Sequence, residues 1–514
     1  MTRRQLVLTA AVCAAFAAFA TWRSSLPGVN EPHYLCKARH FWDPAWCARD
    51  QFLTSANAHW VFYATVGSLT RVFSFDQAAW IGRMIVWGGL AFAWVRLSSR
   101  LLGERWLPLL AALFTLAILA PGSMAGEWLV GGVESKGFAY AALLVALDAA
   151  CSQKWREAAI AAGVSISFHP IVGGWGVVAL GAAHLTGRAS QTRLDLQDGP
   201  GSPSYGLRVW RGILVPGLLC LVCSLPGLIP AVALLANSPS PAEARAADVI
   251  QVFDRLDHHL DPKKFRLVGY ALDAVLLVLW MVLRRSCDRT DSERFFARFV
   301  TATLAIAALG LIVGFGWRLP GLMKFYPFRL SDVFLPIAVS VSATEIVARV
   351  AANSGGAVKN AIARLACPVL AVIAIVWCTV APGRNENASN YKAENWREFL
   401  DACRWIEQKT AADSLFLTPR HNVGFKWYAQ RAEYVTWKDC PQDAAGILEW
   451  KARLDLIVRW RERDDRFSKV ALAELNRDTG IDYVLDWTAY RYRVQPVYRN
   501  RMFAVYPVIH RARE

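Results

Sequence analysis

Hydrophobic residues in this chain gather in long runs, and short clusters of Lys and Arg follow every second run. The runs are about as long as a bilayer is thick and recur from residue 5 to residue 382. The basic clusters lie at 3–4, 96–105, 154–156, 188–211, 284–298 and 349–364. Because cytoplasmic loops of membrane proteins are enriched in Lys and Arg, this alternation predicts which loops are inside and which are outside.

The hydrophobic runs predict about eleven membrane crossings, with the N-terminus inside and the C-terminus outside. The continuous runs are 5–22, 78–97, 106–121, 136–151, 211–236, 266–284, 297–316, 331–350 and 363–382. The region 158–187 is interrupted by His169-Pro170 and Gly173-Gly174, and both of its ends are basic. It therefore predicts two short or re-entrant helices.

Polar segments between the runs predict the remaining organisation of a membrane domain over 1–383. They are an outer loop over 23–57, an amphipathic helix in the membrane interface over 58–75, a cytoplasmic loop over 188–210 and an outer loop over 237–265.

From residue 384 to residue 514 the composition becomes that of a soluble, extracytoplasmic α/β domain. Helical spacing recurs at 395–409, 443–463 and 471–477, and strand patterns recur at 414–418, 481–486 and 501–506. The predicted fold class is thus mainly α, a polytopic helical membrane domain followed by a small α/β domain.

Composition supports a membrane protein and disfavours a nucleic-acid binder. Hydrophobic residues make up 55% of the chain, and the formal net charge is +16. The excess charge lies in short loops beside membrane spans, where orientation and anionic lipids account for it. We find no basic stripe interleaved with aromatic residues, so membrane lipids are the expected partners and nucleic acid is not.

Most of the eleven Cys residues fall in apolar runs, where they are expected to pack as small hydrophobic residues. Cys36 with Cys47, and Cys403 with Cys440, lie in segments predicted to be outside. Each pair is a candidate disulfide there.

The first outer loop carries an acidic residue, Glu31, immediately after the first span. A carboxylate in this position can hold a divalent metal or act as a general base, or it can be a solvated loop acid. His33 and His59 belong to the same segment and are candidate substrate-binding residues.

A second pair of carboxylates, Glu127 and Glu134, lies in the next outer loop, close to Lys136. The loop is short, so both side chains are expected near the headgroup plane. A carboxylate there needs a partner, which can be Lys136, a metal or a substrate.

Three cations, Arg318, Lys324 and Arg329, occupy a later outer loop, followed by Asp332 at the start of a span. Arg and Lys at the membrane surface suit a phosphate or pyrophosphate group, although headgroup contacts also explain such residues. Asp332 is a further binding candidate, or a partner of Arg329, or a helix cap.

The soluble domain contributes Arg420, Lys426 and Trp427, which lie in a loop rich in aromatic and charged residues. Such residues suit stacking against a sugar ring, and they equally suit docking of the domain. The chain has no Gly-rich phosphate loop, HExxH or GxSxG sequence, which disfavours nucleotide hydrolysis, zinc proteolysis and serine hydrolysis.

This layout resembles the GT-C class of membrane glycosyltransferases, which use polyprenyl-phosphate-linked sugars. The resemblance rests on an early acidic residue (Glu31), a helix beginning near His59, a span that begins near Arg83 and a second acidic position at Glu127 or Glu134. A C-terminal α/β domain completes it. The chain departs from many members at Asn30, where they have Asp.

The chain also resembles uncharacterised bacterial multi-pass proteins that share the Asn-Glu-Pro-His-Tyr and Phe-Lys-Trp-Tyr-Ala stretches. This second kinship names no substrate. The resemblance to the GT-C class implies a protein of the bacterial inner membrane that transfers sugar to an envelope acceptor on the outer face. Glu31, Glu127 and Glu134 would be catalytic, with or without a divalent metal. The alternatives are a lipid or sugar transporter, or flippase, and a non-catalytic envelope assembly protein.

Overall fold

The computed structural model describes residues 2–103, 106–195, 203–236, 240–287, 290–352 and 357–508. Parts of the expected loops 188–210 and 237–265, at 196–202 and 237–239, lie outside the described residues.

The chain forms two compact units. The first consists of Met1–Arg23, Arg83–Ile229 and Leu256–Arg384. The second consists of Ser24–Gly82, Pro230–Arg255 and Asn385–Glu514.

A helix occupies each of the predicted crossings. They are α1 (Arg3–Arg23), α5 (Phe75–Leu102), α6 (Leu107–Leu119), α7 (Ser135–Cys151), α8 (Trp155–Phe168), α9 (Pro170–Asp195), α10 (Pro203–Ala236), α13 (Leu267–Arg284), α14 (Asp291–Ile312), α16 (Arg329–Ala352) and α17 (Ala357–Val380). The expected break at His169 is confirmed, because α8 ends there and Pro170 begins α9.

Among the described residues, 7 helices are long and apolar enough to cross a membrane, and α6 and the second half of α17 are shorter apolar helices. The chain is therefore a multi-pass membrane protein.

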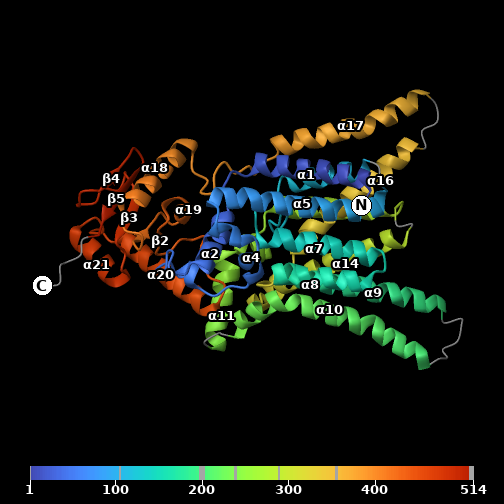
Figure 1. Ribbon diagram of the computed structural model, residues 1–514, viewed down its shortest axis with the longest axis horizontal. Coiled ribbons are helices and arrows are strands. Elements are labelled where there is room, and N and C mark those ends of the chain that lie inside the picture. The colour runs from blue at the N-terminus through green and yellow to red at the C-terminus, as the bar shows by residue number, and fades with distance from the viewer. Residues whose placement is uncertain are drawn as a thin grey trace. The chain divides into compact units, whose positions relative to one another are not determined.

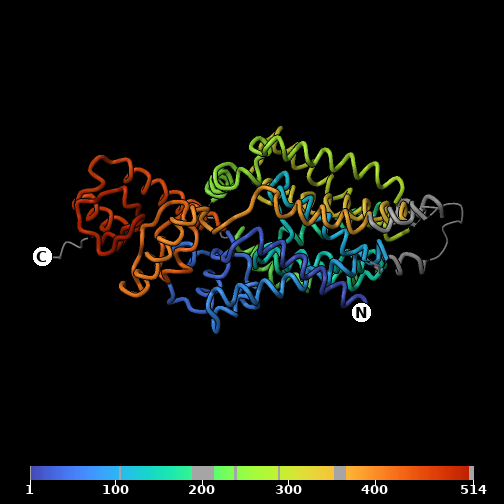
Figure 2. Tube along the Cα trace, turned by 90° about the horizontal axis from the view of Figure 1, so that it is seen from above, coloured from blue at the N-terminus to red at the C-terminus, as the bar shows by residue number. Residues whose placement is uncertain are grey.

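The first unit is a bundle of helices that run alongside one another in both views (Figures 1 and 2). Helix α16 packs against α6, α13 and α14, while α7 packs against α8 and α9. The core contains large buried side chains from several helices, among them Trp87, Trp94, Tyr140, Phe299 and Phe334. Short elements complete this unit: α12 (Asp257–Leu260), η3 (Pro262–Lys264), η4 (Val313–Trp317) and α15 (Pro320–Met323).

The second unit contains a sheet in the order β2-β1-β3-β5-β4. Its strands are β1 (Leu415–Leu417), β2 (Ala432–Glu433), β3 (Tyr483–Trp487), β4 (Tyr498–Arg499) and β5 (Phe503–Pro507). Strand β1 is parallel to β2 and β3, whereas β5 is antiparallel to β3 and β4. The three strands predicted from the sequence, at 414–418, 481–486 and 501–506, are confirmed as β1, β3 and β5.

Helices of the second unit come from all three of its segments. They are α2 (Glu31–Trp42), α3 (Gln51–Thr54), α4 (Trp60–Ala64), η1 (Val66–Arg71), α11 (Pro241–Val249), η2 (Ile250–Arg255), α18 (Ala393–Lys409), α19 (Phe425–Ala429), α20 (Ala444–Glu462) and α21 (Lys469–Thr479). Helices α18, α20 and α21 confirm the predicted helical spacing.

The single helix expected over 58–75 is instead two short segments, α4 and η1. Thr65 separates them with φ −100° and ψ −89°, outside the helical region. A Cβ on Gly67 would lie 2.6 Å from the Cβ of Ala38, so η1 packs tightly against α2.

The structure describes all eleven Cys residues, and none of them forms a disulfide. The candidate disulfides Cys36–Cys47 and Cys403–Cys440 are therefore not formed. Burial raises the pKa of the Cys36 and Cys403 thiols well above the ordinary value, which disfavours the reactive thiolate.

Candidate functional site

Buried charges of the first unit gather around a non-helical stretch between α6 and α7. This stretch carries Glu127 and ends at Glu134, the residue that precedes α7. Glu127, Glu134 and Lys136 are only 7%, 3% and 7% exposed. Burial of several charges together is costly unless they pair closely, so their geometry is informative.

Two carboxylates and two cations pair in this cluster. Lys136 Nζ lies 3.3 Å from Glu127 Oε1 and 3.8 Å from Glu134 Oε2. Arg329 Nε lies 3.0 Å from Glu127 Oε2. The structure therefore brings Arg329 to Glu127 and close to Glu134, two carboxylates that the sequence places in a different outer loop.

Arg329 also contacts His169, at the break between α8 and α9. Arg329 Nη1 lies 3.0 Å from His169 Nε2. Because guanidinium is only a donor, this contact is a hydrogen bond in the tautomer of His169 whose Nε2 carries no proton. His169 was not among the predicted site residues. The signal that could have found it is a His-Pro pair inside an apolar region, where a polar side chain needs a partner.

Asp332 holds the loop that carries Glu127. Its Oδ2 accepts hydrogen bonds from Ser123 Oγ at 2.7 Å, Ala125 N at 3.0 Å and Glu127 N at 3.2 Å. The residue is 1% exposed, and among the described residues its Oδ1 has no hydrogen-bond partner. In this structure Asp332 thus organises the backbone beside Glu127.

His259 holds the same loop through another contact. Its Nδ1 donates to the carbonyl oxygen of Ala125 at 2.5 Å. Gly126 has φ +74°, and a Cβ there would lie 2.8 Å from the His259 ring, so only glycine fits this close approach. Burial, and secondarily the neighbouring His258, lowers the pKa of His259 to about 3, so the imidazole is neutral near pH 7.

The other cations predicted to bind phosphate make their own contacts within the first unit. Arg318 Nη2 lies 3.2 Å from Oδ2 of the buried Asp261. Lys324 is half-buried, and its Nζ lies 5.7 Å from the centroid of the Phe325 ring.

The predicted residues of the first outer loop lie in the second unit. Glu31 begins α2, is fully buried, and its Oε2 accepts a hydrogen bond from Gly28 N at 2.7 Å. His33 Nδ1 lies 3.1 Å from Asp439 Oδ1, and burial lowers the pKa of His33 to about 4. His59 is buried at the start of α4, with its ring 5.4 Å from that of Tyr34.

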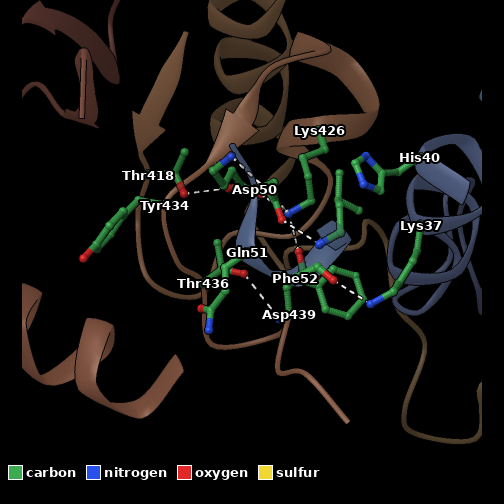
Figure 3. A network of polar contacts seen from close by, with 12 residues as sticks. Lys37, His40, Asp50, Gln51, Phe52, Thr418, Lys426, Tyr434, Thr436 and Asp439 are labelled. Atoms are coloured by element: carbon green, nitrogen blue, oxygen red, sulfur yellow. Dashed lines mark hydrogen bonds and ion pairs between the residues drawn. The ribbon is translucent and has the colours of Figure 1, made fainter. Parts of the chain in front are cut away.

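Lys426 is the centre of a buried ion network in the second unit (Figure 3). Its Nζ lies 3.1 Å from Asp50 Oδ2, 2.9 Å from Glu433 Oε2 and 2.5 Å from Asp439 Oδ2. Burial opposes the charge of Lys426, but the three carboxylates hold its pKa well above the ordinary value. Burial also raises the pKa of Glu433, to about 7.

Trp427 and Arg420 differ in exposure. Trp427 is 4% exposed, donates from Nε1 to Asp76 Oδ1 at 2.7 Å and stacks on Phe75 with centroids 4.9 Å apart. Arg420 is exposed, and its guanidinium carbon lies 4.6 Å from the centroid of the Trp437 ring. Lys426 and Trp427 therefore hold segments of the second unit together.

Neither carboxylate cluster has the geometry of a metal site. Among the described residues, no group of three or more His, Cys, Asp or Glu side chains is placed so that it could hold a metal ion. A Lys ammonium contacts Glu127 and Glu134 in one cluster, and another lies between the carboxylates of the Lys426 network. These residues, with a Lys ammonium already at their carboxylates, do not fit a divalent cation.

Comparison with known proteins gives three findings. Residues 397–457 match the family described as a domain of unknown function (DUF6798). No curated protein matches the chain. A crystal structure of the Archaeoglobus fulgidus oligosaccharyltransferase in the apo form is similar at 11% identity and a TM-score of 0.48, covering 94% of this chain and 69% of that one. The residues matched by the family include Lys426, Glu433 and Asp439.

Proposed function

We propose that this protein is an integral membrane glycosyltransferase that moves a sugar from a polyprenyl-phosphate donor to an envelope acceptor on the outer face of the membrane. One observation carries the proposal: Glu127, Glu134, Lys136 and Arg329 form a buried cluster inside a unit of membrane-spanning helices. Ionisable groups in such surroundings are costly and typically functional.

The cluster contains the two kinds of group that this reaction needs. A carboxylate, Glu127 or Glu134, takes the proton of the acceptor hydroxyl as its oxygen bonds to the anomeric carbon. The bond between that carbon and the phosphate oxygen breaks, and its electron pair leaves with the polyprenyl phosphate. Arg329 and Lys136 stabilise the charge that develops on the leaving group.

Arg329 is suited to serve two partners at once. Guanidinium has five N–H donors in a planar fork, so contact with Glu127 does not exhaust its capacity for a phosphate. Asp332 and His259 hold the loop around Glu127, which limits the movement of its backbone. A fixed carboxylate near a fixed cation is the preorganisation that transfer chemistry requires.

A flippase for lipid-linked sugar is the second candidate. The break between α8 and α9 places a polar residue, His169, against Arg329 in an apolar region. Broken helices with polar groups are typical of transporters.

The test compares lipid-linked and envelope saccharides in cells that lack the protein and cells that produce the wild type, Glu127→Gln or Glu134→Gln. We expect the deletion and both variants to accumulate lipid-linked sugar and to lose a sugar from an envelope glycan. Glu157→Gln is the matched control, because Glu157 is 57% exposed at its side chain and pairs only with Lys154 among the contacts described for it.

Undiminished transfer by both Glu127→Gln and Glu134→Gln would refute the proposal. Accumulation of the lipid-linked sugar on the inner leaflet alone would favour the flippase. An unchanged envelope in the deletion strain would favour a function outside both classes.

A further inference from the structure

A second group of charged and aromatic residues lies in the second unit, and none of them contacts Lys426 among the described ion pairs. It is formed by the loop that follows β1, containing Arg420 and His421, and the loop that follows β2, containing Trp437. Because β1 and β2 are parallel neighbours, both loops leave the same edge of the sheet. The carboxyl edge of parallel strands is the usual position of ligand sites in α/β sheets.

Backbone and side-chain contacts fix the position of Trp437. Trp437 N donates to the carbonyl oxygen of Arg420 at 2.8 Å, which joins the two loops. Trp450 Nε1 on α20 donates to the carbonyl oxygen of Thr436 at 2.8 Å, and the Trp437 and Trp450 rings lie 5.4 Å apart.

Two guanidinium groups lie over the Trp437 ring. That of Arg420 is 4.6 Å from the ring centroid, and that of Arg255, at the end of η2, is 5.9 Å from it. Arg255 Nη2 donates to the carbonyl oxygen of Lys438 at 3.0 Å, which anchors η2 to the second loop. The two Arg residues come from distant parts of the sequence, and both lie near the Trp437 ring. Both also lie near His421, whose pKa is lowered first by burial and then by these two cations.

These two cations lack acidic partners. Among the described residues, neither Arg255 nor Arg420 forms an ion pair with a carboxylate. Arg255 is 9% exposed, and within the same residues its Nε has no hydrogen-bond partner. Asp439, the acid next to Lys438 in the sequence, is engaged by Lys426 and His33. A buried guanidinium without a counter-charge is costly, so the site has an unmet requirement for an anion.

We propose that Arg255 and Arg420, held over Trp437, bind an oxyanion, phosphate or carboxylate, carried by a saccharide. The role of this saccharide rests on the proposed function, in which it is the acceptor of the transferred sugar. Guanidinium groups bind both oxyanions through paired N–H donors. Both guanidinium groups lie near the Trp437 ring and within electrostatic reach of His421, and we expect one anion to contact both of them.

The experiment measures binding of glucuronate, glucose 6-phosphate, inorganic phosphate and glucose to the full-length protein in lipid nanodiscs, by ligand-observed NMR. We expect the charged sugars to bind and glucose not to bind. Affinity should fall as salt is raised, because Arg420 is exposed to solvent. The two charged sugars distinguish a carboxylate from a phosphate, and inorganic phosphate shows whether the sugar contributes.

Arg420→Gln should weaken binding of the charged sugar about tenfold or more, since a charge-assisted hydrogen bond is lost. Arg255→Gln should do the same, whereas Arg255→Lys retains part of the affinity. Arg404→Gln is the control, because Arg404 is an exposed residue of the same unit that pairs with Asp401. Thermal unfolding of each variant shows whether its fold is intact.

Three results would overturn the proposed anion site. They are equal binding of glucose and glucuronate, no binding of either charged sugar, and wild-type affinity in both Arg255→Gln and Arg420→Gln. Failure of the transferase proposal is a separate result. If Glu127→Gln and Glu134→Gln both leave transfer intact while the charged sugar still binds, the transferase proposal is refuted and the anion site remains. If binding of the charged sugars is absent but Glu127→Gln or Glu134→Gln abolishes transfer, only the anion site is refuted.

Discussion

At the scale of single residues, the buried charges of this protein are matched one against another. Lys426 contacts three carboxylates, and Glu127 contacts two cations. Pairing of this kind contributes little net stability when complete, but removal of one partner leaves the others buried and unbalanced. Single substitutions therefore have large and testable effects.

Lys426→Met removes the only cation that contacts all of Asp50, Glu433 and Asp439 among the described residues. We expect the free energy of unfolding of the second unit to fall by about 3–5 kcal/mol, because uncompensated buried carboxylates remain. Thermal or denaturant unfolding of the purified protein measures the change.

Lys451→Met is the control for Lys426→Met, since Lys451 pairs with Asp455 one helical turn away and its side chain is 32% exposed. Its cost should be about 0.5 kcal/mol or less. Equal effects of the two substitutions would contradict the central role of Lys426.

His259 gives a pH dependence of defined sign. Its pKa is lowered from 6.5 to about 3 in the folded protein, chiefly by burial. Between these values the unfolded chain binds a proton that the folded protein does not, so stability is lost as the pH falls from about 6.5 toward 3. We expect His259→Gln to lose less stability over this range than the wild type, measured as the unfolding midpoint at each pH.

The cations near His259 include Lys136 and Arg329, and they are present in both the wild type and the His259→Gln variant. A difference between the two in pH dependence therefore reports on His259 itself. A wild type and a His259→Gln variant with the same pH slope would show that His259 does not titrate as the structure indicates.

At the scale of elements, the first residues of α16 organise the stretch between α6 and α7. Arg329 contacts Glu127, and one turn later Asp332 accepts three hydrogen bonds from Ser123, Ala125 and Glu127. The first turn of α16 thus provides both the cation that pairs with Glu127 and the carboxylate that holds the backbone of Glu127. A loop fixed in this way is expected to exchange its amide protons slowly.

Asp332→Ala should increase hydrogen exchange in peptides that cover 121–134, because two buried N–H donors lose their acceptor. The cost is about 1–3 kcal/mol for each unsatisfied group. Asp332→Asn retains a carbonyl acceptor and should have a smaller effect. Hydrogen exchange followed by mass spectrometry measures both variants.

Ser340→Ala, on the same helix, is the control for Asp332→Ala, since the Ser340 hydroxyl bonds only the Pro336 carbonyl among its described contacts. If exchange over 121–134 is unchanged in Asp332→Ala, the loop does not depend on this carboxylate.

At the scale of the whole molecule, hydropathy predicted the helices but not which polar residues contact one another. The positions of α1, α5 and α16 follow from the length of apolar runs, which is a local property. The partners of Lys426 follow from tertiary packing, because Asp50 and Glu433 are 383 positions apart. No periodicity in the sequence links such residues. The sequence can therefore indicate each charged residue as a candidate, but it does not identify its partner.

Two predictions illustrate this limit on single residues. Asp332 was assigned to substrate binding, yet its described contacts are with the loop over 123–127. Trp427 was considered for stacking on a sugar, yet it is buried against Phe75. Burial of a polar or aromatic residue depends on elements distant in sequence, which composition and spacing do not reveal.

The sidedness of the chain remains a prediction of the basic clusters and can be measured directly. Alkaline phosphatase, which is active only outside the cytoplasm, should be active when fused after residue 390 and inactive when fused after residue 286. The second position lies in the basic cluster over 284–298, expected to be cytoplasmic. The reverse pattern would place the second unit in the cytoplasm and remove the proposed reaction from the outer face.

The wide separation of the residues around Lys426 has a consequence for biosynthesis. Asp50 leaves the ribosome long before Glu433, which lies 383 positions later. At ordinary rates of translation this interval is about 20–80 s. During that time the first outer loop has no counter-ion from the C-terminal segment, and it is exposed to membrane proteases and chaperones. Chains that stop before residue 385 should therefore be degraded rapidly, which pulse-chase labelling would detect.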